Sequence, residues 1–345
     1  MMRRYTPLFL IAFIFCVVLL VSNICLEGYA DNNKDEKIRK SITVYTTLPV
    51  ETAVVLAEEY EKENKIKINF IFMNENELLL NVKEKQSAEG QADAILADKE
   101  VLIKMAKLDA FVKYNLEETD IIADRFKDKQ GAWVGLWYDP IVFCANKDYL
   151  KTLNALPTSW KSLAELNNCR IGITDFLVAD ASSNLLYTLI AEYDEQKAFN
   201  LMKQIHPKII QYSKYLSTPV RMAGMGDVDI SIAVQSESIR YINDEFPIAL
   251  IYPSEGTAYT LTGIAMLKSS KNKDTVKEFM HWLLGDEVQL CLQKNKIFFV
   301  PTNPMTLAYK SFGGKNLNLF ENYSDLTKEQ KDAVLDRWIK NIRLN

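Results

Sequence analysis

Short apolar runs alternate with amphipathic helical patterns along almost the whole chain. Residues 41–45 predict a strand, and a polar elbow at 46–51 leads into a helix whose apolar side includes Leu56 and Tyr60. A wholly apolar run at 94–97 is typical of a strand that is covered on both faces. This alternation predicts an α/β fold of mostly parallel sheets with helices on both faces. Further strands are expected at 66–72, 170–174, 209–212, 229–234 and 248–252.

Three other helices have recognisable signatures. Asn74 and Glu77 form a capping-box-like start, in which two side chains satisfy the first free N–H groups of a helix. A helix is expected at 275–290, and a last amphipathic helix at 326–342 carries Trp338 on its apolar side. We expect this last helix to pack against the body of the protein.

The first 30 residues have the pattern of a secretion signal. A basic start at 3–4 and an apolar run at 7–24 precede the small residues Gly28 and Ala30. We expect cleavage after Ala30 and therefore an exported protein. A retained membrane anchor and a lipoprotein cut before Cys25 are the alternatives.

The composition narrows the class of protein. There are 41 basic and 45 acidic residues, so nucleic acid and anionic membranes are poor partners. Two of the five cysteines lie in the expected signal, which leaves Cys144, Cys169 and Cys291. A Cys144–Cys169 bridge and buried free thiols both fit the sequence. The remaining length suits one large domain or two lobes.

Catalytic and cofactor motifs are lacking in the sequence. The two histidines, His206 and His281, have no second histidine or cysteine at metal-ligand spacing. No nucleophile elbow, phosphate-binding glycine loop or dinucleotide fingerprint occurs. We therefore expect neither an enzyme nor a cofactor. An exported hydrolase with a serine–lysine or carboxylate pair assembled in space remains an alternative.

Polar segments follow four of the expected strands. The carboxyl ends of strands and the starts of helices are where open α/β sheets bind ligands. Each segment alone fits a helix cap or a turn, but together they predict a binding site for a small solute. The segments are Thr46-Thr47, Asp180-Ala181-Ser182-Ser183-Asn184, Gln235-Ser236-Glu237-Ser238 and Pro253-Ser254-Glu255-Gly256-Thr257-Ala258-Tyr259.

Several short motifs, in a fixed order, carry a resemblance to a known family. They are Ile42-Thr43-Val44-Tyr45-Thr46-Thr47, Leu156-Pro157-Thr158-Ser159-Trp160, Pro253-Ser254-Glu255-Gly256-Thr257 and Val300-Pro301-Thr302-Asn303-Pro304. With them the chain resembles the bacterial extracellular solute-binding proteins of family 1. The closer resemblance is to the group of ferric-iron, phosphorylated-sugar and phosphonate binders. It spans nearly all of residues 41–304.

The resemblance implies a two-lobed periplasmic-binding-protein fold of class II, with lobes joined by crossover strands near 137–143 and 253–265. It also implies a monomer in the periplasm that delivers solute to an ABC permease with its ATPase. Trp137 and Tyr138 are expected to line the cleft or to pack at the hinge. The expected parts are a signal at 1–30, lobe 1 at 41–138 and 256–300, lobe 2 at 139–255, and C-terminal helices at 301–345 that pack on the lobes.

The family's phosphate-holding Ser-Ser-Gly turn resembles Ser182-Ser183-Asn184 here. With Thr46 and Thr47, these serines are expected to hold the acid group of a sugar phosphate or an aminophosphonate. The other end of the solute, rich in hydroxyls or amines, is expected to meet Gln235, Glu237 and Glu255. Asn184, Ser236 and Thr257 are further expected contacts of the solute. Arg221 and Arg240 are candidate partners for the anion.

Ferric iron is the main alternative solute. The iron binders of this group use a histidine and two adjacent tyrosines, whose positions are occupied here by Pro49 and by Glu237-Ser238. Asp98, Glu237 and Glu255 would be the oxygen ligands of such a site. A sensor or adhesin that keeps the fold without transport is a further alternative.

Overall fold

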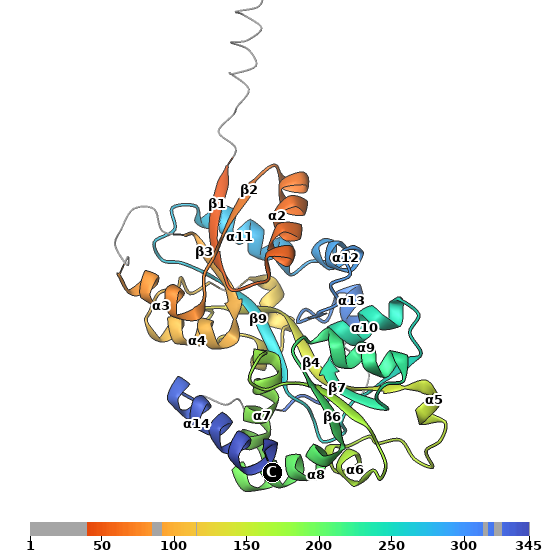
Figure 1. Ribbon diagram of the computed structural model, residues 1–345. Coiled ribbons are helices and arrows are strands. Elements are labelled where there is room, and N and C mark those ends of the chain that lie inside the picture. Colours follow the sequence, from red (N-terminus) through yellow and green to blue (C-terminus); the bar gives the residue numbers. More distant parts are fainter. Residues whose placement is uncertain (1–39, 85–91, 115, 313–316, 321–325, 345) are drawn as a thin grey trace, which may run out of the picture.

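The computed structural model describes residues 40–84, 92–114, 116–312, 317–320 and 326–344 (Figure 1). The expected signal at 1–30 lies outside the described residues. Within the described part, no helix is long and apolar enough to cross a membrane. The helices and strands form a mixed α/β fold with two lobes.

Lobe 1 combines the first strand–helix units with a later part of the chain. β1 pairs in parallel with β2 and β3, and β9 pairs antiparallel to β3. The strands are β1 (Ser41–Thr46), β2 (Lys67–Phe72), β3 (Ala94–Asp98), β9 (Tyr259–Met266) and β10 (Val300–Pro301). The helices are α2 (Val50–Asn64), α3 (Glu75–Glu84), α4 (Lys99–Lys107), α11 (Lys273–Leu283), α12 (Asp286–Lys294) and α13 (Leu307–Phe312), with 3-10 turns η1 (Glu117–Ile121) and η2 (Asp124–Phe126).

Lobe 2 repeats the pattern around a second parallel set, in which β5 pairs with β6 and β7. The strands are β5 (Ile171–Thr174), β6 (Ile209–Ser213), β7 (Ile230–Val234) and β8 (Ile248–Ile251). The helices are α5 (Lys147–Leu150), α6 (Trp160–Glu165), α7 (Asp180–Tyr193), α8 (Glu195–Ile205), α9 (Ser217–Met225) and α10 (Gln235–Asn243), with the 3-10 turn η3 (His206–Lys208). The chain ends in α14 (Lys328–Trp338), which continues as a π-helical turn, η4 (Ile339–Arg343).

One long strand, β4 (Val134–Asn146), joins the two lobes (Figure 1). Its first half pairs with β9, and its second half, from Ile141, pairs with β7 and β8. All these pairs are antiparallel, so the crossover strands separate the two parallel sets. β4 and β9 approach closely where Gly135 faces Gly263, and a Cβ on Gly263 would lie 2.6 Å from the Val134 carbonyl oxygen. Glycine is required at this crossing because no side chain fits there.

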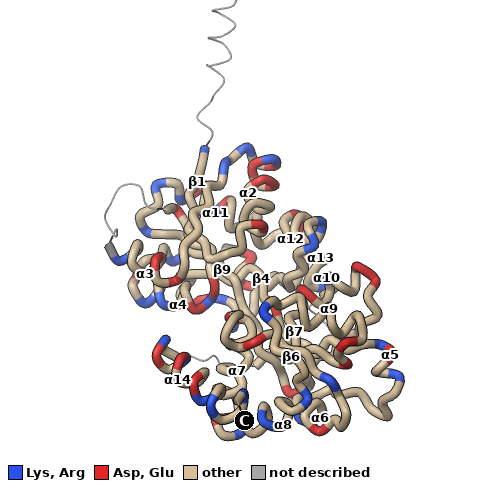
Figure 2. Tube along the Cα trace, viewed as in Figure 1, with Lys and Arg blue, Asp and Glu red and all other residues tan. Residues whose placement is uncertain are grey.

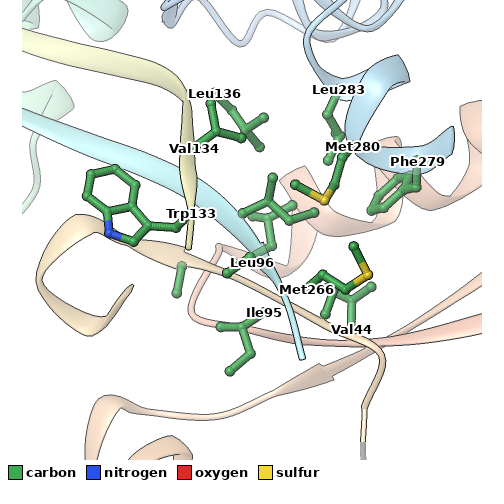
Figure 3. Close-up of a cluster of buried hydrophobic side chains, with 14 of the residues drawn as sticks. Val44, Ile95, Leu96, Trp133, Val134, Leu136, Met266, Phe279, Met280 and Leu283 are labelled. Carbon is green, nitrogen blue, oxygen red and sulfur yellow. The ribbon is translucent and has the colours of Figure 1, made fainter. Parts of the chain in front are cut away.

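Each lobe has its own apolar core. In lobe 1, side chains of β1, β3, β4, β9 and α11 meet, among them Val44, Leu96, Met266 and Phe279 (Figure 3). A second core is built mainly from β5, β7, α7 and α8. Separate apolar cores in the two lobes are what a fold with two lobes that move on a hinge requires. The residue boundaries of the lobes stay a prediction.

The three cysteines named above are buried free thiols, so no Cys144–Cys169 bridge forms.

The helix expected at 275–290 is two helices, which is a correction to the sequence analysis. α11 ends at Leu283, and α12 begins at Asp286. Gly285 lies between them with an extended backbone (φ −87, ψ 175), which interrupts the helical turn. Asp286 and Glu287 in the first turn of α12 favour a new helix start there.

Candidate functional site

A cleft of about 1020 Å³ lies between the lobes. Lobe 1 contributes the ends of β1 and β3 and the starts of α2, α3 and α4, at 46–50, 72–77 and 98–101. Lobe 2 contributes 176–180 and further residues of α7. The start of β9, at 259–261, also belongs to the cleft wall. Five residues of the C-terminal segment complete it, Leu326, Lys328, Lys331, Asp332 and Leu335. The cleft therefore lies where an open α/β sheet places its ligands.

Three helix N-termini without a side-chain cap open onto the cleft. Pro49, Asp98 and Ala179 are the N-cap residues of α2, α4 and α7, and none of them makes a capping side-chain hydrogen bond. In α7 the N–H groups of Ser182 and Ser183 both donate to Ala179 O at 3.0 Å, so the helix supplies no acceptor for the two preceding N–H groups. Free N–H groups and helix dipoles that converge on one space favour an anion there.

The start of α3 is capped, as expected from its sequence. Asn74 N–H donates to Glu77 Oε2 at 2.9 Å, and Glu77 N–H donates to Asn74 Oδ1 at 3.0 Å. The reciprocal pair is the predicted capping box. α3 therefore offers the solute less free hydrogen-bonding capacity than α2, α4 or α7.

Charged side chains of both signs line the cleft, with carboxylates in excess. Four lysines, Lys99, Lys104, Lys328 and Lys331, face six carboxylates, Glu75, Glu77, Asp98, Glu100, Asp180 and Asp332. Figure 2 shows this mixture along α3, α4 and α14. Lys104 pairs with Glu75, and Lys331 pairs with Glu100. The acidic surplus suits a solute that carries amine or hydroxyl donors as well as an acid group.

The carboxyl group of Asp98, which lines the cleft, has a raised pKa. The cleft walls remove much of the hydration of its carboxyl group, and the charges of Asp180, Glu100 and Glu75 add to that effect. Together they raise the pKa of Asp98 to about 7. The residue keeps exposed surface toward the cleft, so water there moderates the effect. Asp180 belongs to lobe 2, so charges from both lobes contribute to the raised pKa of Asp98.

The cleft is lined by five of the expected solute and iron contacts, Thr46, Thr47, Asp98, Ser183 and Asn184, and by Asp180 and Tyr259 from the polar segments named above. The Thr46 hydroxyl is already engaged, since it donates to Leu96 O at 2.8 Å and accepts from Leu48 N–H at 3.0 Å. Asn184 Nδ2 donates to Tyr259 O at 3.0 Å and so links α7 to β9. Ser182 is buried in α7 next to Ser183 and is not part of the wall.

The segment at 235–237 lies outside the cleft wall and is held by its neighbours. Ser236 donates to Asp139 from its N–H at 2.9 Å and from its hydroxyl at 2.5 Å. Glu237 forms an ion pair with Arg240 at 2.7 Å. Gln235 is fully buried, and its Nε2 donates to Phe312 O at 3.3 Å. These side chains fix the start of α10 to β4 and α13.

Glu255 and Thr257 also hold the fold together. Glu255 accepts from the N–H groups of Trp160 and Lys161 at 3.2 and 3.4 Å and so caps α6. The buried Thr257 hydroxyl donates to Ile141 O at 2.7 Å.

Trp137 and Tyr138 lie buried on β4, outside the cleft wall. The Trp137 ring stacks on Phe299 and the Tyr138 ring on Phe126, with centroids 6.0 and 4.8 Å apart. Both rings therefore pack in the core of lobe 1, where β4 pairs with β9 and β10. Arg221, on α9, is exposed and contacts Met225 Sδ at 3.8 Å.

The candidate iron ligands do not come together. Asp98 lines the cleft, Glu237 is paired with Arg240, and Glu255 caps α6. Among the residues that the structure describes, no group of three or more His, Cys, Asp or Glu side chains is arranged to hold a metal ion.

Asp139 gives a testable dependence of stability on pH. Burial raises the pKa of this carboxyl to about 7, although the hydrogen bonds from Ser236 act in the opposite direction. Between about pH 4, where an unfolded aspartate titrates, and about pH 7, the folded carboxyl keeps its proton and the unfolded one loses it. The free energy of unfolding therefore falls as the pH rises through this window. Asp139→Asn should flatten this fall by up to about 1.4 kcal/mol per pH unit.

Denaturant unfolding of both proteins at several pH values between 4 and 8 measures this difference. Asp336→Asn, which alters an exposed carboxylate on α14, is the matched control. Parallel pH profiles for Asp139→Asn and the unaltered protein would contradict the shifted pKa.

Several cleft residues of α14, α3 and α4 were not singled out in the sequence. Lys328, Lys331, Glu75 and Lys104 look like the solvated faces of amphipathic helices, which is their ordinary role. Only the position of these helices beside the cleft reveals them.

The sequence and the fold of this chain were compared with those of known proteins. Residues 55–312 match the model of a family described as bacterial extracellular solute-binding protein. An uncharacterized protein of Haemophilus influenzae is 29% identical over 254 residues, which cover 69% of this chain and 72% of that protein.

Solved structures share the fold. The periplasmic binding protein AfuA from Actinobacillus pleuropneumoniae, with fructose-6-phosphate bound, superposes with a TM-score of 0.65 at 22% identity and covers 89% of this chain and 100% of its own. The ferric binding protein from Campylobacter jejuni gives 0.66 at 18% identity, with 87% and 98% covered. The chain therefore belongs to the bacterial extracellular solute-binding proteins, the periplasmic receptors that supply ABC importers with solute.

Proposed function

We propose that this receptor captures a small organophosphorus solute, an aminophosphonate or a sugar phosphate, between its lobes. The observation that carries the proposal is the convergence of three uncapped helix N-termini, those of α2, α4 and α7, on one cleft. Their N–H groups would receive the acid group, with the Thr47 hydroxyl as an added donor. The Ser183 hydroxyl donates to Asp180 O at 3.1 Å and would turn from this acceptor to the solute. The fructose-6-phosphate bound to AfuA supports this class of solute.

Asp98 and Asp180 of the cleft wall would receive the other end of the solute. Three other cleft carboxylates are engaged within the protein, Glu75 by Lys104, Glu77 by Asn74 and Glu100 by Lys331. Burial, and after it the charge of Asp180 on lobe 2, raises the pKa of Asp98 on lobe 1. A positively charged amine between them is attracted to both carboxylates and joins the lobes. This favours an aminophosphonate over a sugar phosphate, because hydroxyl donors compensate two charges less completely.

Closure on a hinge at β4 and β9 would complete capture, since these strands connect the lobes. The mature receptor would begin at Asp31, after cleavage of the signal, and act as a monomer. It would hand the solute to a permease that is coupled to an ATPase. No covalent chemistry is required of this chain.

A thermal-shift screen of the mature chain tests the assignment. The panel contains 2-aminoethylphosphonate, hexose phosphates, inorganic phosphate, thiamine phosphates, and ferric iron with and without a synergistic anion. A solute at about a hundred times its dissociation constant adds roughly 2.7 kcal/mol to the free energy of unfolding. Stabilisation by organophosphorus compounds supports the proposal. Stabilisation by ferric iron alone overturns it and makes the receptor an iron binder like the Campylobacter protein.

Two hydroxyl deletions test where the acid group lies. Thr47→Ala should raise the dissociation constant about tenfold, since it removes one charge-assisted hydrogen bond. Ser183→Ala should raise it by less, because the Ser183 hydroxyl gives up its bond to Asp180 O when it reaches the solute. Ser182→Ala is the matched control, because Ser182 is buried beside Ser183 and does not line the cleft. Isothermal titration gives all three values. Equal affinities for Ser182→Ala and Ser183→Ala would place the acid group elsewhere.

A further inference from the structure

The C-terminal helix α14 is anchored on lobe 2. The apolar side chains of Val334, Trp338 and Ile342 are buried in the second core. Arg337 donates from Nε and Nη2 to the two carboxylate oxygens of Glu195 on α8, at 2.6 and 2.8 Å. A two-point ion pair of this kind fixes orientation as well as distance. α14 therefore moves with lobe 2.

The first turns of α14 border the cleft and contact lobe 1, and Lys331 lies seven residues before Trp338, on the same side of the helix. Lys331 Nζ donates to Glu100 Oε2 on α4 and lies 5.4 Å from the centre of the Tyr187 ring. The two side chains of the ion pair are 23% and 25% exposed. Because α4 belongs to lobe 1 and α14 is anchored on lobe 2, this ion pair joins the lobes across the cleft.

Residues 318–320, which precede α14, are held by hydrogen bonds that do not involve Lys331. Thr257 N–H donates to Asn318 O, and Phe320 N–H donates to Thr257 O, both at 3.0 Å. Arg125 Nη1 donates to Leu319 O at 3.2 Å. Loss of the Lys331 contact therefore leaves these attachments and the lobe 2 anchor in place.

We propose that α14 is a strap that holds the lobes together before any solute binds, with the Lys331–Glu100 ion pair as its attachment to lobe 1. Opening of the cleft separates α4 from α14 and breaks this pair. A pair with most of its surface buried is screened less by water and salt than an exposed pair, and opening exposes both charges to water. The strap keeps part of the empty receptor near the closed arrangement, which lowers the conformational cost of capture. It acts without solute and does not depend on which solute is bound.

The distance between the lobes in the solute-free receptor tests the strap. Cysteines at exposed positions on each lobe, Leu80→Cys on α3 and Ile210→Cys on β6, accept spin labels, while the native thiols are buried. Electron–electron double resonance then gives the distance distribution. Lys331→Met and Glu100→Gln should each shift it to longer distances. The exchanged pair Glu100→Lys with Lys331→Glu should restore the original distribution.

Lys203→Met on α8, another exposed lysine of lobe 2, is the control for loss of a positive charge and should change nothing. Circular dichroism verifies that every variant is folded. The two single variants should also raise the dissociation constant of the bound solute about three- to tenfold. Unchanged distances in both single variants, or an exchanged pair that stays open, would overturn the strap. A higher dissociation constant for Lys331→Met with unchanged distances would also overturn the strap, because Lys331 would then be a solute contact.

Discussion

Trp338→Ala is expected to lower the free energy of unfolding by about 3–5 kcal/mol, the cost of a cavity left by a large buried aromatic side chain. Trp338 is fully buried in lobe 2, although it lies only seven residues from the end of the chain. Its ring packs against Phe176, His206 and Tyr212, with centroids 5.0, 6.2 and 6.4 Å away. Denaturant unfolding followed by circular dichroism measures the loss.

Trp338→Phe is the matched control. The Trp338 Nε1–H makes no hydrogen bond to any described residue, so phenylalanine loses only contact area, not a hydrogen bond. We expect a loss of about 1 kcal/mol or less for this variant. A similar small loss for Trp338→Ala would mean that α14 is detached from lobe 2 in solution, which would also remove the anchor of the strap.

The local elements of the fold were predictable from the sequence because they depend on periodicity. The strands expected at 66–72, 209–212 and 229–234 agree with β2, β6 and β7 to within a residue. The capping box at the start of α3 depends on residues three apart and was equally accessible. The break at Gly285 was missed, because a single glycine in an apolar helical pattern is tolerated in many helices.

The candidate site was predictable only in part, because the polar segments looked alike in sequence. The polar segments that contain Thr47 and Ser183 line the cleft. The side chains of the segment at 235–237 instead bond to other parts of the protein. Asp139 on β4 binds Ser236, at a separation of 97 residues. Contacts between residues so far apart in the sequence depend on how β4 crosses between the lobes. Local sequence patterns do not predict that crossing.

The cleft face of α14 escaped prediction for a different reason. Lysines and aspartates in the first turns of a terminal helix are ordinarily part of a solvated surface. The apolar side correctly indicated packing, with Trp338 in the core. Which polar side chains then meet a cleft depends on the rotation of the helix about its axis and on the position of α4, neither of which is encoded within the helix itself.

Ala179→Asp is expected to stabilise the protein and to weaken solute binding at once. Ala179 is the N-cap of α7, lines the cleft, and has the extended backbone (φ −142, ψ 127) typical of a capping residue. An aspartate there can accept from the N–H groups of the first turn, which adds about 1 kcal/mol to the free energy of unfolding. The same carboxylate occupies the groups that we propose for the acid group of the solute. We expect the dissociation constant to rise about ten- to hundredfold.

Ala179→Asn separates the two contributions to this effect. Asparagine caps a helix about as well as aspartate does but adds no charge, so its stabilisation should be similar and its loss of affinity smaller. Thermal unfolding and isothermal titration on the three proteins give both quantities. Stabilisation by aspartate with unchanged affinity would remove the α7 N-terminus from the binding site. Tighter binding in Ala179→Asp would mean that the solute presents positive charge to α7, as a metal ion would, because an added carboxylate attracts cations and repels the acid group of an organophosphorus solute.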